Sequence, residues 1–198
     1  PGDPLGGAIE ALRAGAVVAI RGLGGYHLAA DPRNEATMRR LRRDKERERK
    51  PFALMVRDLE VAARLCAPGA LDRAAAAELA SERSPILILP ARDPQALRLV
   101  SDTGTLGVFL PYTALHLLLF RHPACRAADA LVMTSANLKG QPMVTAPEQA
   151  RGKLSGIADL FLDHDRRILF RADDSVLRPC ARGPALCQIR RSRGYVPG

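Results

Sequence analysis

The stretch AVVAIRGLGGYHLAADPRNEATMRRLRRDKERERKPFALMV, residues 16–56, decides the fold class of this chain. It opens with an apolar run at 16–20, passes through a glycine-rich turn, and returns as a second apolar run at 26–30. An arginine-rich helix, predicted for 34–43, then leads through a charged loop to a third apolar run at 52–56. Strands that alternate with helices predict an α/β sheet.

Apolar runs and helical periodicities continue this alternation along the chain. Helices are predicted at 6–14, 59–65, 71–80, 113–120 and 145–154, and strands at 86–89, 106–110 and 131–133. Thr145 and Glu148 have the spacing of a capping box at the start of the last helix. Short strands are expected from Asp159 onward. The fold predicted is therefore α/β, a twisted, mixed, open sheet with helices packed on it.

The length of 198 residues suits one ordinary core, so a single domain over residues 1–198 is expected. Because the chain begins at Pro1 and not at Met, we expect it to be a fragment of a longer multidomain protein. With 30 Lys and Arg against 21 Asp and Glu, its net charge of +9 suits an anionic partner, a nucleotide or a nucleic acid. The chain has neither a long apolar run nor a signal peptide, which predicts a cytoplasmic protein with no membrane partner.

The charged loop DKERERKP, residues 44–51, could clamp a triphosphate. Its candidate phosphate-binding cations are Lys45, Arg47 and Lys50. Pro51 forces the residue before it out of helical geometry, so we expect an extended loop at the edge of the sheet. Glu46 and Glu48 interleave with the cations, and a solvated charge run is therefore an alternative of equal weight.

Polar side chains follow the strand predicted at 131–133. Thr134, Ser135 and Asn137 belong to a TSAN tetrapeptide directly after that strand. In open α/β sheets ligands bind beyond the carboxyl ends of strands, which predicts that this tetrapeptide lines a pocket. Hydroxyl and amide groups suit phosphate oxygens, ribose or a small carbonyl, while a local Asx or Ser/Thr turn is the structural alternative.

The last quarter of the chain combines a carboxylate pair, Asp173 and Asp174, with Arg190, Arg191 and Arg193. Buried cores rarely need such a set, because an unpaired charge taken out of water is costly. A polyanion with its metal ion would need it, which predicts Mg²⁺ beside a phosphate ligand.

Other catalytic patterns are missing from the sequence. The glycine loop lacks the spacing of a dinucleotide-binding loop or a P-loop, and neither an HExxH helix nor a catalytic cysteine setting is found. His116, on an apolar helix, is expected to be a partly buried histidine with satisfied nitrogens. Cations and a divalent metal leave phosphate positioning, and hence nucleotidyl transfer, as the chemistry best suited to these residues.

Together these motifs resemble the YrdC family, and within it the HypF branch, which also includes antibiotic O-carbamoyltransferases. The resemblance is carried by GLGGYHLAAD (22–31), K-x-R-x-x-K-P (45–51), FALMV (52–56), LVMTSANLKGQP (131–142), GIADLFLDHDRRI (156–168), RADDSVLR (171–178) and RRSRGYVP (190–197). It extends over about residues 12–197. The K-x-R-x-x-K-P and TSAN motifs are general to the family, whereas GLGGYHL, DDSVLR and RRSRGYVP are specific to the HypF branch.

This resemblance implies a YrdC-like sheet around a concave, basic cavity that binds ATP. It also implies the reaction: carbamate derived from carbamoyl phosphate attacks the α-phosphate of ATP, carbamoyl-adenylate forms, and pyrophosphate leaves. In the family the intermediate passes to an adjacent transferase domain and then to a HypE-like acceptor protein during [NiFe]-hydrogenase maturation.

Residue roles follow from the resemblance position by position. The implied catalytic residues are Lys45, Arg47, Ser135 and Asn137; the implied ATP and phosphate ligands are Lys50, Thr134, Arg191 and Arg193. Asp173 or Asp174 is expected to place Mg²⁺ or to orient the arginines.

Two alternative functions remain open from the sequence. A threonylcarbamoyl-adenylate synthase for tRNA modification is the first, although this chain reads GLGGYHL where a T-x-Y-G-L segment is expected near a threonine site. A non-enzymatic module that binds double-stranded RNA is the second, suggested by the charge of +9. The low aromatic content, 4% with no Trp, and the acids near every basic cluster count against RNA.

Overall fold

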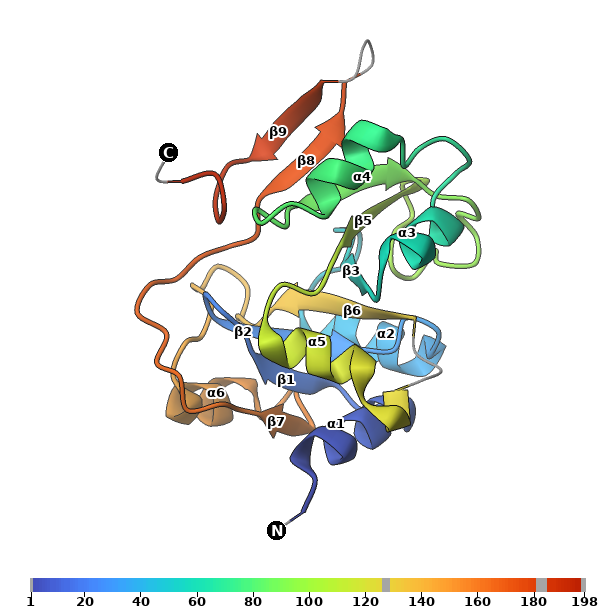
Figure 1. Cartoon of the computed structure of the whole chain (residues 1–198). Coiled ribbons are helices and arrows are strands. Elements are labelled where there is room, and N and C mark those ends of the chain that lie inside the picture. The colour runs from blue at the N-terminus through green and yellow to red at the C-terminus, as the bar shows by residue number, and fades with distance from the viewer. Residues whose placement is uncertain (1, 126–128, 181–184, 197–198) are drawn as a thin grey trace.

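The computed structural model describes residues 2–125, 129–180 and 185–196. Within them, nine strands form a single sheet in the order β7-β1-β2-β6-β3-β5-β4-β8-β9 (Figure 1). The strands are β1 Val18–Arg21, β2 Tyr26–Ala30, β3 Ala53–Val56, β4 Ile86–Pro90, β5 Thr105–Phe109, β6 Ala130–Ser135, β7 Leu160–Leu162, β8 Val176–Pro179 and β9 Leu186–Arg190. Pairs β1–β7, β3–β5 and β4–β8 are parallel and the other five are antiparallel, which confirms the prediction of a mixed, open sheet.

The helices are α1 Pro4–Arg13, α2 Glu35–Asp44, α3 Leu59–Leu65, α4 Arg73–Leu79, α5 Ala114–Arg121 and α6 Pro147–Leu154, with a short 3₁₀ turn at Pro123–Cys125. Helices α1 to α5 each begin at an Asp, Asn or Thr whose side chain accepts a hydrogen bond from a first-turn N–H group. The capping box predicted for α6 is wrong. That helix starts after Ala146 without a side-chain cap, with Pro147 at its first turn. No helix of the described ranges has the length and apolarity that a membrane span requires.

The loop predicted to be extended between α2 and β3 is instead tightly closed. The N–H groups of Glu46 and Arg47 donate to the carbonyls of Arg43 and Arg42, both at 2.9 Å, and so finish α2 with a sharp turn. Glu46 takes a left-handed φ of 47° there. The strand that follows, β3, is the fifth of nine, so the loop leads into the middle of the sheet rather than to its edge.

The central strands present small side chains in a row on one face of the sheet. Met133 of β6 pairs with Ala53 of β3, which pairs with Gly107 of β5, which pairs with Ile88 of β4. Side chains alternate between the two faces of a strand, so these four point the same way. Their neighbours on the other face, such as Leu54, are fully buried in the core. The row is therefore hollow at its centre, where Ala53 and Gly107 lie.

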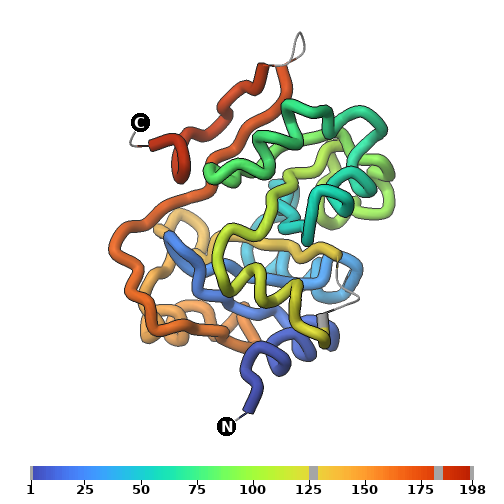
Figure 2. Tube along the Cα trace, in the orientation of Figure 1, coloured from blue at the N-terminus to red at the C-terminus, as the bar shows by residue number. Residues whose placement is uncertain are grey.

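The segment from 163 to 175 connects β7 to β8 along one side of the molecule (Figure 2). The N–H of Ala172 donates to the carbonyl of Gly24 in the glycine turn at 3.3 Å. A Cβ at Gly24 would lie 2.3 Å from the Ala172 carbonyl oxygen, so this close approach requires glycine. As a result the carboxylate pair at 173 and 174, far from β2 in sequence, lies beside it.

Candidate active site

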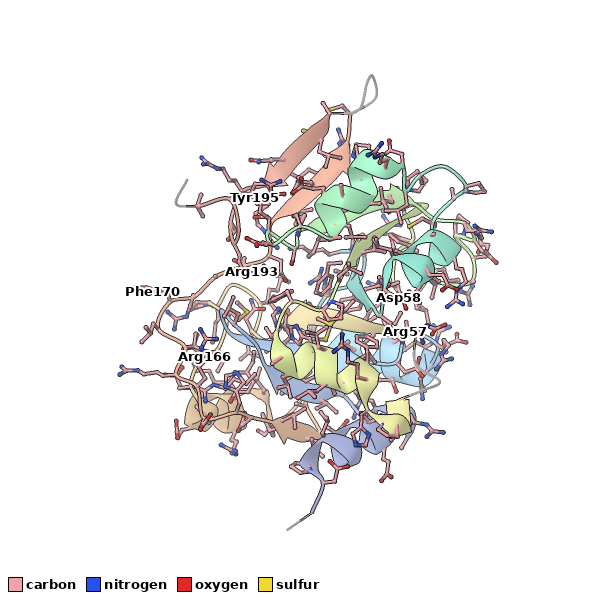
Figure 3. All side chains as sticks on the ribbon, viewed as in Figure 1. Arg57, Asp58, Arg166, Phe170, Arg193 and Tyr195 are labelled. Carbon is pink, nitrogen blue, oxygen red and sulfur yellow. The ribbon has the colours of Figure 1, made fainter. Side chains whose placement is uncertain are left out.

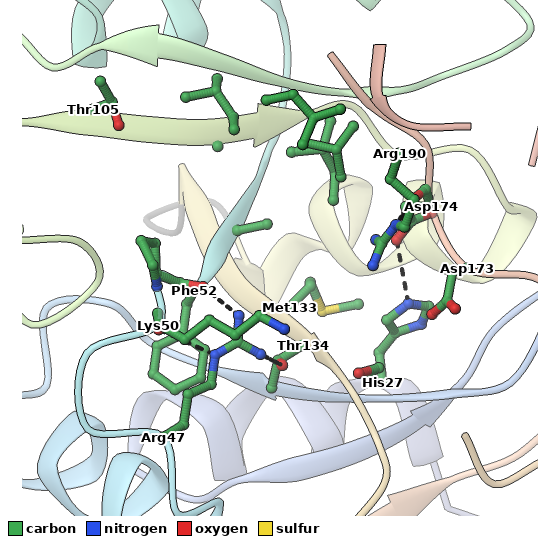
Figure 4. Close-up of a pocket in the computed structure, with 18 residues that line it drawn as sticks. His27, Arg47, Lys50, Phe52, Thr105, Met133, Thr134, Asp173, Asp174 and Arg190 are labelled. Atoms are coloured by element: carbon green, nitrogen blue, oxygen red, sulfur yellow. Dashed lines mark hydrogen bonds and ion pairs between the residues drawn. The ribbon is translucent and has the colours of Figure 1, made fainter. Parts of the chain in front are cut away.

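A cavity of about 410 Å³ lies over the hollow row of the sheet (Figure 4). Its floor is apolar and includes Ala53, Gly107, Met133, Ile86 and Ile88. Its polar lining consists of His27, Arg47, Lys50, Thr105, Thr134, Ser135, Asp173, Asp174 and Arg190. Such a combination suits a ligand with one flat apolar part and one charged part.

Arg47 belongs to the cavity wall, as the sequence led us to expect. Its Nη1 donates to Thr134 Oγ1 at 3.0 Å, and it also donates to the carbonyl of Pro51. The guanidinium lies over the Phe52 ring, 4.9 Å from the centroid. Burial, with the nearby charges of Arg42 and Arg190, lowers the pKa of Arg47 to about 10, so positive charge is concentrated here and an anion would be stabilised.

Lys45 holds the TSAN loop and does not line the cavity. Its Nζ donates to the carbonyls of Ser135 at 2.8 Å and Asn137 at 2.6 Å, and to Asn137 Oδ1 at 3.1 Å. Burial, with the charges of Arg47 and Lys50, lowers the pKa of Lys45 to about 8. The lysine therefore shapes the loop on which Thr134 and Ser135 face the cavity.

The remaining residues predicted from the first two motifs are divided in the same way. Lys50 is exposed and lines the cavity together with Thr134 and Ser135. Asn137 is one step behind them: its Oδ1 accepts from Ser135 Oγ at 2.9 Å, and its Nδ2 donates to the carbonyl of Gln141 at 2.8 Å. The structure thus brings Lys45, Arg47 and the TSAN loop together.

Arg193 is placed differently from the expectation that it closes over phosphates (Figure 3). Its side chain is only 10% exposed, and it pairs with Asp174 Oδ1 at 2.9 Å. The same guanidinium donates to the carbonyls of Arg83 at 3.1 Å and Ser84 at 2.9 Å, and lies over the Tyr112 ring at 3.7 Å. Its donors are occupied, and it is not among the residues that line the cavity.

The carboxylate pair has two distinct environments. Burial raises the pKa of Asp174, but the hydrogen bonds and charges of His27 and Arg193 outweigh burial and hold that pKa well below its ordinary value. Of the two roles expected for the pair, orienting an arginine fits Asp174. Asp173 is exposed at the cavity. Within the described ranges, no group of three or more His, Cys, Asp or Glu residues could hold a metal ion.

Two residues of the cavity wall were not among the predicted site residues. Arg190 lines the cavity and donates from Nε to the carbonyl of Asp174 at 2.8 Å, whereas Arg191 donates from Nε to the carbonyl of Tyr195 at 3.0 Å. The strand period could have identified Arg190, because Arg190 and Arg191 point in opposite directions. His27 was read as an ordinary strand residue, and only tertiary structure brings it to Asp174.

His116 departs from the prediction of a partly buried, satisfied histidine. It is 0% exposed, and neither ring nitrogen has a hydrogen-bond partner in the described part of the chain. Its ring lies edge-on to Tyr112 at 4.8 Å and 6.2 Å from the His27 ring. Burial, aided by the charge of His27, lowers the pKa of His116 to about 3, so it is neutral at ordinary pH.

Comparison with known proteins agrees with the fold and the cavity. The model of the Sua5/YciO/YrdC family, described as "Telomere recombination", matches residues 10–192. The chain is 45% identical to carbamoyltransferase HypF of Rhodobacter capsulatus over 198 residues, which are 100% of this chain and 25% of that protein. It is 44% identical to carbamoyltransferase HypF2 of Cupriavidus necator over 209 residues, 98% of this chain and 26% of that protein.

A crystal structure of full-length HypF in the phosphate- and nucleotide-bound form superposes with a TM-score of 0.90 and 38% identity. The match covers 99% of this chain and 25% of that one. The chain thus spans about a quarter of the length of the HypF proteins it matches. It belongs to the Sua5/YrdC family and, within that family, is similar to the HypF carbamoyltransferases.

Proposed function

We propose that this chain is the ATP-using domain of a HypF-type carbamoyltransferase and that it forms carbamoyl-adenylate from carbamate. A carbamate oxygen attacks the α-phosphorus of ATP, the bond from that phosphorus to the bridging oxygen breaks, and pyrophosphate leaves. The observation that carries this proposal is the cavity, which combines a hollow apolar floor with a wall of cations. Catalysis of this transfer consists mainly of orientation and charge neutralisation.

Each part of the cavity has a proposed task. The adenine lies on the floor over Ala53 and Gly107, where the sheet leaves room. Arg47 and Lys50 neutralise the β- and γ-phosphates, which depart as pyrophosphate. Thr134 and Ser135 offer hydroxyl groups to the α-phosphate. Lys45 and Asn137 act one step away, because they hold the TSAN loop in shape.

Magnesium fits this site in a limited way. Asp174 is engaged by Arg193 and His27, which leaves Asp173 as the carboxylate of the pair that is exposed at the cavity. Mg²⁺ in nucleotide sites commonly uses one or two carboxylates together with phosphate oxygens. Asp173 would therefore hold the ion jointly with the nucleotide, and the ion would supply charge neutralisation for the triphosphate.

The longer relatives place this reaction in a wider proposal. Because the matched HypF proteins are about four times as long, we propose that the carbamoyl group moves on to an adjacent transferase domain and then to a HypE-like acceptor during hydrogenase maturation.

The RNA-binding alternative is weakened by how the arginines of α2 are used. Arg39 pairs with Glu35, Arg40 with Asp159, and Arg43 with Asp44. Arg42 donates to backbone carbonyls, among them that of Leu99 at 2.7 Å. Cations already neutralised in this way contribute little to binding a phosphate backbone.

Pyrophosphate release tests the proposal. The chain is incubated with ATP and Mg²⁺, and ammonium bicarbonate as a source of carbamate is compared with threonine plus bicarbonate. We expect release with the first mixture and loss of at least tenfold in Lys50→Ala. Lys153→Ala, an exposed lysine on α6, is the matched control and should be fully active. Release only with threonine would move the chain to the tRNA-modifying reaction, and a failure to bind ATP would reject both.

A further inference from the structure

His27 is a fixed wall of the cavity. It lies on β2 opposite Ser135 of β6 and is 5% exposed. Its Nε2 is 3.5 Å from Asp174 Oδ2, while a Cβ on Gly22 would lie 2.9 Å from its Nδ1. The ring is thus packed against the glycine turn on one side and paired with a carboxylate on the other.

The partner of His27 is itself immobilised. Asp174 accepts from Arg193, whose other donors bind the carbonyls of Arg83 and Ser84. His116 lies close behind, with its ring centroid 6.2 Å from that of His27. A side chain held by buried partners on this scale keeps one rotamer, so it limits the space available to a ligand in a way that an exposed side chain would not.

The two polar ends of the cavity differ in charge. Figure 4 shows Arg47 and Lys50 at one end, and His27, Asp173, Asp174 and Arg190 at the other. A departing pyrophosphate suits the first end, which carries only cations. The second end mixes acids with an arginine and an imidazole, and it therefore suits a small group that both donates and accepts hydrogen bonds, such as the –CO–NH₂ of a carbamoyl group.

We propose that His27 is the specificity-determining residue of this site: its fixed ring closes the end of the cavity so that a carbamoyl group fits and a carbamoyl group bearing a substituent on nitrogen does not. This inference rests on the proposed formation of carbamoyl-adenylate. It names the substrate class as unsubstituted carbamate, and it assigns Asp174 and Arg193 as positioning residues that act through His27.

Binding of two stable adenylate analogues by calorimetry tests the inference without turnover. One is 5′-O-(N-carbamoylsulfamoyl)adenosine, and the other carries an isobutyl group on the terminal nitrogen. The unaltered chain should bind the isobutyl compound at least about tenfold more weakly than the small one. In His27→Ala that ratio should fall below about threefold, because the added group enters the space of the imidazole.

Three controls separate steric selection from damage to the fold. His27→Gln keeps the length and an amide donor, so it should retain the discrimination; His27→Asn is shorter, so it should lose discrimination even if His27→Ala does not fold. His122→Ala removes a histidine that pairs with Asp3 instead, and should change neither affinity.

Equal affinity of the unaltered chain for the two analogues, or an unchanged ratio in the folded small variants, would overturn the role of His27 while leaving the proposed function in place. Failure of the unaltered chain to bind either analogue would instead reject the proposed adenylate site and the inference with it.

Discussion

Two arginine-rich segments border the cavity, 45–50 and 190–193, and each contains one cation that is buried and one that faces the ligand space. In the first, Lys45 is used to hold the TSAN loop while Lys50 is exposed at the cavity. In the second, Arg193 is locked to Asp174 while Arg190 faces the cavity. The comparison teaches that the residue type and motif of a cation do not determine its role. What decides it is whether backbone carbonyls and carboxylates have already taken its donors.

The largest effect should come from the buried cation of the C-terminal segment. Arg193→Met removes the partner of a buried carboxylate and should lower the free energy of unfolding by about 3–5 kcal/mol. Urea denaturation measures this loss. Adding Asp174→Asn to the same chain should recover part of it, since no uncompensated charge is then buried. A stability change below about 0.5 kcal/mol together with a large loss of ATP affinity would instead make Arg193 a phosphate ligand.

Acid should destabilise this same cluster through His116. Its pKa of about 3 in the folded chain lies below the ordinary 6.5, so the unfolded chain takes up the proton first as pH falls. Stability from this group is complete above about pH 6.5 and should decline by about 3 kcal/mol on going to pH 4. Urea midpoints for His116→Phe should show a correspondingly flatter decline. A parallel decline in the two proteins would contradict the assignment.

Loss of the buried cation in the first segment should cost less. Lys45→Met leaves two backbone carbonyls of the TSAN loop without their donor, which should reduce stability by about 1–3 kcal/mol. Pyrophosphate release should also fall, because Ser135 and Thr134 lose their placement. Lys139→Met, on an exposed lysine paired with Glu46, is the matched control and should leave both measurements unchanged.

The smallest stability effect, and the sharpest functional one, is expected for the cations that face the cavity. Arg190→Ala should change the free energy of unfolding by less than about 0.5 kcal/mol, because its side chain is exposed. ATP affinity, measured by calorimetry, should nevertheless fall about tenfold or more, as the loss of a charge-assisted hydrogen bond predicts. Unchanged ATP affinity would remove Arg190 from the proposed site.

The predicted fold was recovered because its signals are local. Apolar runs such as 16–20 and 52–56 are visible in any short window, and both are strands in the structure. The start of α6 and the turn at Glu46 were predicted wrongly, because capping and left-handed turns depend on contacts that residue spacing does not reveal.

The candidate site was only partly predictable for the same reason. Lys45 and the TSAN loop meet because α2 and β6 lie near each other, as a βα pattern suggests. By contrast, the pairing of His27 with Asp174 joins residues that are 147 positions apart, across the long segment after β7. Nothing local marks either residue as a partner of the other, so burial of this pair and of Arg193 emerges only from the folded chain.

The hollow row over Ala53 and Gly107 makes the bound nucleotide a temporary part of the protein interior. A larger residue at either position would pack the face more densely, as the 3.1 Å approach of a Cβ at Gly107 to Ile86 Cγ2 illustrates. The chain retains instead a vacancy shaped for a planar guest. Its empty form is therefore underpacked by design of the sequence, and each cycle of binding and release alternately completes and reopens the interior of the molecule.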